Sequence, residues 1–379
     1  MAIDPLIFIF LSSGLFLGWA LGANDAANVF GTAVGTKMVS WRTAAIICSI
    51  CVLLGAVFSG AGTTETLGKL GAISALPGAF MTALSAGFSV FIMTKGGLPV
   101  STSQAIVGAI IGWNFFSQKP TDTTILLKIL STWILCPLLA GIIAVLIVQS
   151  VKFVSRRMAI HMITLDAIKR IALIVAGGLG AYALGANNIA NVVGVFIPVQ
   201  PFPTLELGNF TISSAQQLLL LGGLSIGLGV FTYSRKVMET VGSQLGSLSA
   251  TTALIAVISH SIVLFMFASR GLETFLSNLG LPTIPLVPVS SSQAVVGAII
   301  GISILKGLAS INWAVLGKII IGWVLAPVVA FIICFIGLFF LQNVFSLQVV
   351  EKFTTINGLI KNFIMDLYYN SNLLCIPSY

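Results

Sequence analysis

Long apolar segments constrain the fold of this chain more than any other feature. The first covers about residues 6–34, and later ones cover about 124–151 and 313–342. Each is longer than the ~20 residues with which a helix crosses a bilayer. Charged residues make up only 7% of the sequence, whereas soluble domains carry about 25%. The sequence therefore predicts an all-α polytopic membrane protein.

The sequence is also duplicated within itself. Residues 22–31 read GANDAANVFG, residues 185–194 read GANNIANVVG, and residues 99–112 are nearly repeated at 288–301. Two further landmarks occur once in each half, in the same order: Glu65 and Glu239, and Trp133 and Trp323. We therefore expect two inverted-topology repeats of about five or six membrane segments each, with broken helices and re-entrant hairpins.

The expected domain organisation follows from this duplication. The repeats are expected at residues 1–151 and 171–345, with a C-terminal tail at 346–379. A basic linker at 152–170 joins the repeats and carries five Lys or Arg residues against one Asp. Basic loops stay on the cytoplasmic side, so we expect this linker in the cytoplasm and the protein in the plasma (inner) membrane as a multi-pass protein. The same rule accounts for the net charge of +8 without a nucleic-acid partner.

We name residues 22–31 and 185–194 the asparagine motifs. Asp25 is their only carboxylate, because Asn188 takes its place in the second copy. A carboxylate at membrane depth is costly and therefore points to a functional site, with a surface loop as the alternative. We expect the first apolar helix to be interrupted near its motif, where freed carbonyls and side-chain oxygens suit a hard cation such as Na⁺. The candidate sodium ligands in these motifs are Asn24, Asp25, Asn28, Asn187 and Asn188.

Residues 99–104 and 288–293, which read PVSTSQ and PVSSSQ, form a second pair that we name the serine motifs. Proline is favoured at a helix start, and Ser and Thr are favoured N-caps. Their hydroxyls and the free amide groups of a helix N-terminus suit an anion, with ordinary helix capping as the alternative. The candidate anion ligands are Ser101, Thr102, Ser103, Gln104, Ser290, Ser291, Ser292 and Gln293.

Three more ionisable residues lie within apolar segments or near the ends of such segments. Glu65 and Glu239 each precede a Thr-x-Gly sequence at the end of a segment. Their matched placement favours sodium binding or gating near the site, and a solvated loop carboxylate is the alternative. His260 lies between Ser259 and Ser261 in an apolar segment, where a hydrogen-bonded packing histidine is favoured over a proton relay.

Inverted repeats with broken helices are typical of secondary transporters, whose binding site lies near mid-membrane between the repeats. A channel would need a continuous pore, whereas half-helices that meet at mid-membrane favour an occluded site. The H-E-x-x-H metal motif does not occur, and His260 has no His or Asp at catalytic spacing. The chain is therefore predicted to be a transporter and not an enzyme.

The asparagine and serine motifs together resemble the signatures of the inorganic phosphate transporter (PiT) family, and the resemblance extends from Leu11 to Gln342. It implies a homodimeric symporter that imports inorganic phosphate with Na⁺, or with H⁺ in some bacterial members, by alternating access. It also implies that Glu65 and Glu239 matter for transport. The residues that it places at the phosphate and cation sites are Asp25, Asn28, Asn188, Asn191, Ser101–Gln104 and Ser290–Gln293.

The sequence departs from the pattern of that family at three points. Asn188 stands where the second motif usually has Asp, and Gln104 and Gln293 stand where many members have His. Loss of these histidines favours Na⁺ as the coupling ion. The short central loop is similar to that of bacterial or archaeal members. Proton-coupled phosphate transport, and transport of another tetrahedral oxyanion such as sulfate, are the alternatives.

Overall fold

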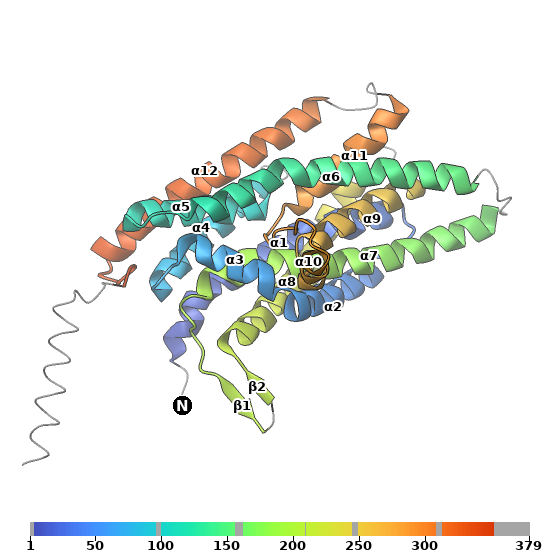
Figure 1. Cartoon of the computed structure of the whole chain (residues 1–379). Coiled ribbons are helices and arrows are strands. Elements are labelled where there is room, and N and C mark those ends of the chain that lie inside the picture. Colours follow the sequence, from blue (N-terminus) through green and yellow to red (C-terminus); the bar gives the residue numbers. More distant parts are fainter. Residues whose placement is uncertain are drawn as a thin grey trace, which may run out of the picture. The chain divides into compact units, whose positions relative to one another are not determined.

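Almost the whole of the described chain is helical (Figure 1). The computed structural model describes residues 4–95, 100–155, 162–208, 210–244, 249–307 and 313–351. Residues 1–349 form one unit and residues 350–379 form a second, of which only Val350 and Glu351 are described. Most of the predicted C-terminal tail, 346–379, therefore lies outside the described residues.

The helices and strands follow one another along the chain as α1 (Pro5–Gly35), α2 (Trp41–Ser59), α3 (Ala61–Gly71), α4 (Leu76–Lys95), α5 (Thr102–Ser117), α6 (Thr123–Ser155), α7 (Met162–Val193), η1 (Gly194–Phe196), β1 (Leu205–Leu207), β2 (Phe210–Ile212), α8 (Ser214–Gln244), α9 (Ala250–Met266), α10 (Arg270–Asn278), α11 (Ser291–Lys306) and α12 (Trp313–Asn343). The two short strands pair antiparallel, with Glu206 opposite Thr211.

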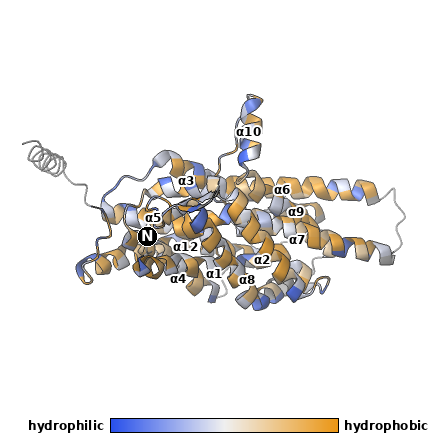
Figure 2. Ribbon diagram, turned by 90° about the horizontal axis from the view of Figure 1, so that it is seen from below, coloured by the Kyte–Doolittle hydropathy of each residue, from blue (hydrophilic) through white to orange (hydrophobic). Residues whose placement is uncertain are grey.

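The predicted polytopic all-α fold is confirmed. Seven helices in the described part of the chain are long and apolar enough to cross a membrane, and there are up to eight if α9 and α10 form one span bent by 67°. The helices consist mostly of hydrophobic residues, as the hydropathy colouring in Figure 2 shows, and many of their large apolar side chains are exposed. On α6 and α12, for example, Ile134 and Val324 are 73% and 62% exposed. Such surfaces suit lipid and not water.

The two helices that begin in the serine motifs are too short to span. Helices α5 and α11 have 16 residues each, fewer than the ~20 that a bilayer requires. Each begins within a serine motif, directly after extended backbone at Ser101 or Ser290. Their N-termini therefore lie within the protein, as the half-helices of a broken span do.

The predicted interruption of the first helix is wrong. Helix α1 runs without a break through its asparagine motif, and α7 does so as far as Val193. The motif glycines serve close packing instead. A methyl group on Gly22 would collide with the carbonyl of Ile226 on α8, and one on Gly185 would collide with the carbonyl of Val52 on α2. Helices can approach this closely only where no side chain intervenes.

The two halves of the chain interleave. Helix α1 packs on α8 and α7 packs on α2, while α5 packs on α12 and α11 packs on α6. Under the duplication, α1 corresponds to α7, α2 to α8, α5 to α11 and α6 to α12, so every contact has a reciprocal partner. Such reciprocity is what two halves related by an approximate two-fold axis would produce. The inverted topology of the halves stays a prediction.

The linker predicted at 152–170 is helical at both of its described ends. Helix α6 continues to Ser155 and α7 begins at Met162, while residues 156–161 lie outside the described residues. The domain boundaries and the cytoplasmic side of this linker stay predictions.

The half-helices also depend on glycine. A methyl group on Gly108 of α5 would collide with Pro327 of α12, and one on Gly297 of α11 would collide with Pro137 of α6. Gly317 in α12 has no atom within 4 Å of an added Cβ. Two glycines at matched positions thus fit against two prolines at matched positions, and Gly317 offers a control in open space.

We expect Gly108→Ala and Gly297→Ala each to lower the free energy of unfolding by about 1–3 kcal/mol, because the added methyl overpacks a helix contact. Unfolding of the purified protein in detergent, followed by circular dichroism, measures this. Gly317→Ala should keep or raise the stability, because Ala is the better helix former. Equal stability of all three variants would contradict the close contacts.

Candidate functional site

Asp25 lies buried between the two asparagine motifs. Its side chain is on α1 and only 2% exposed. Asn188 of α7 donates from Nδ2 to Asp25 Oδ2 at 3.2 Å, and Asn24 donates from Nδ2 to Asp25 Oδ1 at 3.3 Å. Within the described residues, this carboxylate forms no ion pair. Amide donors alone hold a buried negative charge here, which leaves the site suited to a cation.

The serine motifs cap the two half-helices as predicted. Ser101 Oγ accepts from the amide of Gln104 at the start of α5, and Ser290 Oγ accepts from that of Gln293 at the start of α11, both at 3.2 Å. Each cap satisfies one of the free amide groups of its helix. The N-terminal ends of both helices carry partial positive charge.

The two serine motifs also bond to each other. Ser103 Oγ donates to the carbonyl of Val289 at 3.0 Å, and Ser292 Oγ donates to the carbonyl of Val100 at 3.3 Å. These two bonds are counterparts under the duplication. They bring the N-terminal ends of α5 and α11 together in the interior of the protein.

Each asparagine motif reaches the serine motif of the other half. Asn28 Nδ2 donates to Ser291 Oγ at 3.0 Å. Asn191 Nδ2 donates to Ser103 Oγ at 2.9 Å and contacts Thr102 Oγ1 at 3.5 Å. The structure therefore gathers all four motifs into one hydrogen-bonded group, which we name the central cluster. Its members are Asn24, Asp25, Asn28, Ser101–Gln104, Asn187, Asn188, Asn191 and Ser290–Gln293.

Several oxygens of the central cluster are buried without a hydrogen-bond partner among the described residues. They belong to Gln104, Gln293, Asn188 and Asn191. Buried polar atoms in proteins are nearly always paired, so unpaired ones are available to a bound water, ion or ligand. Nowhere in the described ranges do three or more His, Cys, Asp or Glu side chains gather as a metal site would require. Amide and hydroxyl oxygens with one carboxylate suit a hard monovalent cation and not a transition metal.

Asn187 plays a different part from its neighbours. Its Oδ1 accepts from the amide of Val289 at 2.8 Å, and its Nδ2 donates to the carbonyl of Val287 at 3.2 Å. The side chain is fully buried. It thus bonds the extended segment before α11 and places the second serine motif, and its oxygen is already used.

His260 contacts the central cluster from α9. Its Nε2 lies 2.9 Å from Ser291 Oγ, while Nδ1 is buried without a partner among the described residues. The prediction of a hydrogen-bonded histidine is therefore confirmed, but sequence reasoning missed its contact with the site. The polar triplet Ser259-His260-Ser261 within an apolar helix was the available signal.

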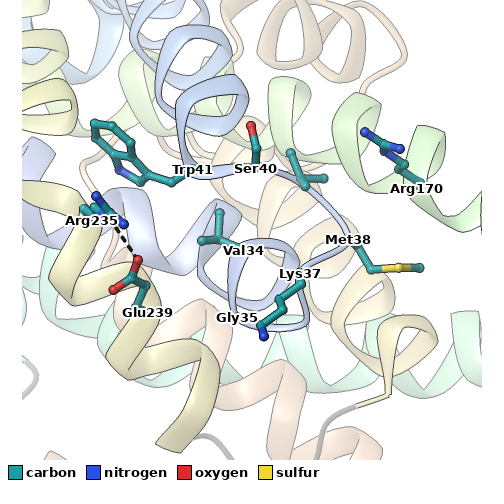
Figure 3. A pocket seen from close by; sticks show the side chains of 10 residues that line it. Val34, Gly35, Lys37, Met38, Ser40, Trp41, Arg170, Arg235 and Glu239 are labelled. Atoms are coloured by element: carbon teal, nitrogen blue, oxygen red, sulfur yellow. Dashed lines mark hydrogen bonds and ion pairs between the residues drawn. The ribbon is translucent and has the colours of Figure 1, made fainter.

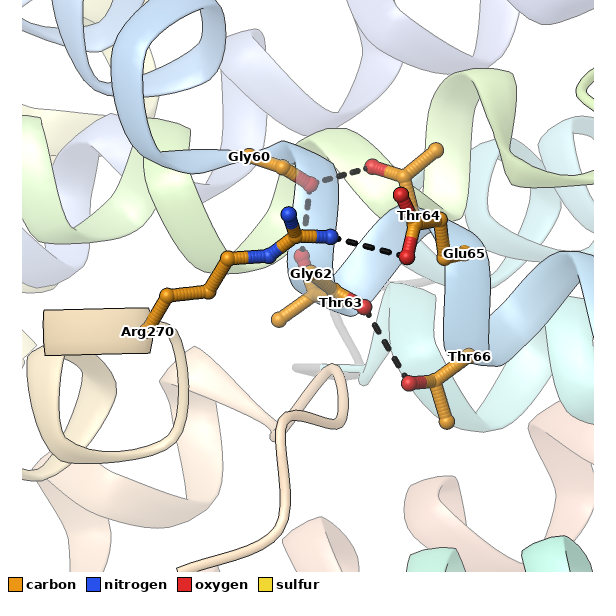
Figure 4. Close-up of polar contacts among 7 residues, drawn as sticks. All are labelled: Gly60, Gly62, Thr63, Thr64, Glu65, Thr66 and Arg270. Atoms are coloured by element: carbon orange, nitrogen blue, oxygen red, sulfur yellow. Dashed lines mark hydrogen bonds and ion pairs between the residues drawn. The ribbon is translucent and has the colours of Figure 1, made fainter. Parts of the chain in front are cut away.

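Glu65 and Glu239, predicted near the cation site, lie elsewhere. Glu65 on α3 pairs with Arg270 at the start of α10, with Oε2 and Nη2 2.8 Å apart (Figure 4). Glu239 pairs with Arg235 one turn earlier on α8, at 3.0 Å. Both carboxylates are 54% exposed. The structure does not bring them into the central cluster, and each pairs with an arginine instead.

Helix α3, which carries Glu65, is fixed to the second asparagine motif. Thr63 Oγ1 donates to the carbonyl of Ala186 at 3.1 Å, and also lies 3.1 Å from the carbonyl of Gly60 (Figure 4). The Glu65–Arg270 pair therefore connects α10 of the second half to a segment of the first half that touches α7. This connection suits gating better than ion coordination.

The sequence matches the model of the phosphate transporter family over residues 21–283 and 276–374. A protein of Methanocaldococcus jannaschii, provisionally named a phosphate permease, is 29% identical over 89% of this chain and 98% of its own length. A protein of Thermococcus kodakarensis with the same provisional name is 27% identical over 88% and 97%. The sulfate permease CysP of Bacillus subtilis is 28% identical over 89% of both chains.

One solved structure is similar across nearly its whole length. Its title is "The sodium-dependent phosphate transporter", and it matches with a TM-score of 0.70 and 24% identity. The match covers 89% of this chain and 99% of that chain. It shows a shared fold.

We expect Asn187→Leu to destabilise the protein by about 1–3 kcal/mol for each of the two backbone groups that lose a partner. The midpoint of thermal unfolding in detergent should fall accordingly. Asn343→Leu is the matched control, because Asn343 is exposed and bonds only the carbonyl of Phe339 in its own helix. Similar midpoints for both variants would show that Asn187 does not hold the extended segment.

Proposed function

The chain belongs to the phosphate transporter family, and on that premise we propose that it imports inorganic phosphate by alternating access, driven by an inward sodium gradient. Members of this family are transporters, so the chain is not an enzyme. The observation that carries the proposal is the central cluster, in which two helix N-termini meet one buried carboxylate.

The phosphate is proposed to bind where α5 and α11 begin. Partial positive charge at the two N-termini favours an anion, and serine and threonine hydroxyls supply further donors. No Lys or Arg is needed for this, as in other sites built from helix ends. The residues proposed to bind phosphate are Ser101, Thr102, Gln104, Ser290, Ser291 and Gln293, with Asn28 and Asn191 beside them. Ser103 and Ser292, whose hydroxyls donate to Val289 and Val100, are proposed to contribute through their backbone amides and by positioning the helix starts.

The sodium ion is proposed to bind at Asp25. The unpaired oxygens of Asn188 and Asn191 supply neutral ligands in the same buried group. Asn24 and Asn28 lie on the same helix and complete the proposed set, whereas Asn187 places the second serine motif. A cation here would offset the repulsion between Asp25 and a phosphate dianion, which makes anion binding depend on the ion.

Glu65 and Glu239 are proposed to act in gating. The Glu65–Arg270 pair joins the two halves at one end of the helices, whereas Glu239 bonds only within α8. An exposed pair contributes less than about 1 kcal/mol to stability, so it can break and form during transport. The cytoplasmic position of the basic linker and the homodimer are further parts of this proposal.

Sulfate is the second candidate substrate, because the sulfate permease of Bacillus subtilis is as similar to this chain as the other relatives are. The two anions differ in one hydrogen-bond donor, by which the proposed site can distinguish them. Phosphate near neutral pH carries an O–H group and sulfate does not. A buried acceptor such as Asp25 rejects an analogue that lacks the donor.

Uptake of labelled orthophosphate into proteoliposomes tests the function, with sodium and pH gradients imposed separately and sulfate as a competitor. We expect an inward Na⁺ gradient at constant pH to drive uptake. Full uptake driven by a pH gradient without Na⁺ would overturn sodium coupling, and faster uptake of labelled sulfate than of phosphate would overturn the substrate.

We expect Asp25→Asn to abolish the sodium dependence and to reduce phosphate uptake at least about tenfold, since a charged hydrogen bond contributes about 1.5–3 kcal/mol. Discrimination against sulfate should fall with it. Asn188→Asp should have a far milder effect on uptake with Na⁺ present, because the bound cation offsets the repulsion between the two carboxylates. Asp166→Asn is the control, because Asp166 is exposed and its one ion pair within the described residues is with Lys169 on its own helix. Wild-type sodium dependence in Asp25→Asn would remove Asp25 from the cation site.

A further inference from the structure

A hollow of about 510 Å³ lies at one end of α1, away from the central cluster. It is bounded by the end of α1, the connection to α2, the first turn of α2, and parts of α7 and α8 (Figure 3). The side chains that matter for its chemistry are Lys37, Met38, Trp41, Arg170, Arg235 and Glu239. Its lining includes no residue of the central cluster.

The lining carries three cations and one carboxylate. Glu239 is already paired with Arg235, at 3.0 Å. Within the described residues, neither Lys37 nor Arg170 has a carboxylate at ion-pair distance. The charge of the lining is therefore positive, and an anion in the hollow would meet cations from α7, α8 and the connection after α1.

The positions of these side chains are fixed by local structure. Lys37 adopts a left-handed backbone conformation, with φ of 58°, and its amide donates to the carbonyl of Val34 at 3.0 Å. The guanidinium of Arg235 lies 5.7 Å from the centre of the Trp41 ring, and Trp41 Nε1 donates to Ser234 Oγ at 3.4 Å. The backbone at Lys37 and the contact between Trp41 and Arg235 thus shape this part of the lining.

Apolar surface continues directly from the hollow. Ile171 follows Arg170 and is 62% exposed, and Phe231 lies one turn before Arg235 and is 50% exposed. Trp41 stands at the rim, and tryptophan favours the boundary between lipid and water. A ligand with a charged group and apolar chains would find partners for both parts.

We propose that this hollow binds the phosphate group of an anionic phospholipid, whose acyl chains lie along the exposed faces of α7 and α8. Basic pockets between membrane helices recognise such headgroups by charge. The apolar faces beside Arg170 and Arg235 favour a lipid over free orthophosphate, which offers the same chemistry without the chains.

Binding of labelled dioctanoylphosphatidylglycerol to the full-length protein in detergent tests the proposal, with the zwitterionic dioctanoylphosphatidylcholine, which has no net charge, as the comparison. Each Lys or Arg contributes about 1 kcal/mol near such a surface, or about fivefold in affinity. We expect Lys37→Gln with Arg170→Gln to weaken binding of phosphatidylglycerol about thirtyfold. Arg42→Gln is the matched control, because Arg42 is exposed beside Trp41 but does not line the hollow. It should bind as the wild type does.

A second variant, which should tighten binding instead of weakening it, tests the proposal even if the Lys37→Gln, Arg170→Gln double variant does not fold. Glu239→Gln removes the only carboxylate of the lining and should tighten binding of phosphatidylglycerol. Unchanged affinity in both variants, or equal loss in Arg42→Gln, would overturn the site. If labelled orthophosphate binds with the same sensitivity to these variants and phosphatidylglycerol does not bind, the lipid is the wrong source of the phosphate group.

Discussion

The reciprocal hydrogen bonds between the two serine motifs hold the rest of the structure in place. Extended backbone inside a membrane protein needs partners from the protein itself, because lipid offers none. Ser103 and Ser292 supply them by donating to Val289 and Val100 of the opposite half. The two helix N-termini that follow are thereby held beside each other. The bonds from Asn28 to Ser291 and from Asn191 to Ser103 reinforce the same arrangement.

Close helix packing makes that arrangement possible. Gly108 and Gly297 let the half-helices lie against the backbone at Pro327 and Pro137. The asparagine motifs follow the same principle, since their glycines bring α1 against α8 and α7 against α2, while the helices stay continuous. A continuous helix then presents Asn24, Asp25 and Asn28 at fixed spacing. The polar side chains, and not a broken backbone, supply the oxygens of the candidate cation site.

The sequence predicts the membrane class, the duplication and the four motifs, because these depend on composition and order alone. It also predicts that the motifs meet, since inverted repeats place matched segments around one centre. The helix break predicted near the first asparagine motif is wrong, because glycine beside asparagine is typical both of a break and of a close helix contact. Only the helix that packs against the motif distinguishes the two cases. The sequence cannot pair Glu65 with Arg270 or His260 with Ser291, because these contacts join residues that no pattern relates.

The two asparagine motifs differ at the position of Asp25 and Asn188, and this difference sets the charge of the candidate cation site. A second carboxylate in place of Asn188 would face Asp25 at hydrogen-bond distance, and two like charges 4 Å apart repel by about 4 kcal/mol at an effective dielectric of 20. Asn188 removes that repulsion and donates a hydrogen bond to Asp25 instead. Asp25 then remains as the one carboxyl group of the two asparagine motifs, which is what the proposed site for one monovalent cation requires. The duplication thus supplies two matched helix N-termini, while the Asn at position 188 makes the two asparagine motifs unequal in charge.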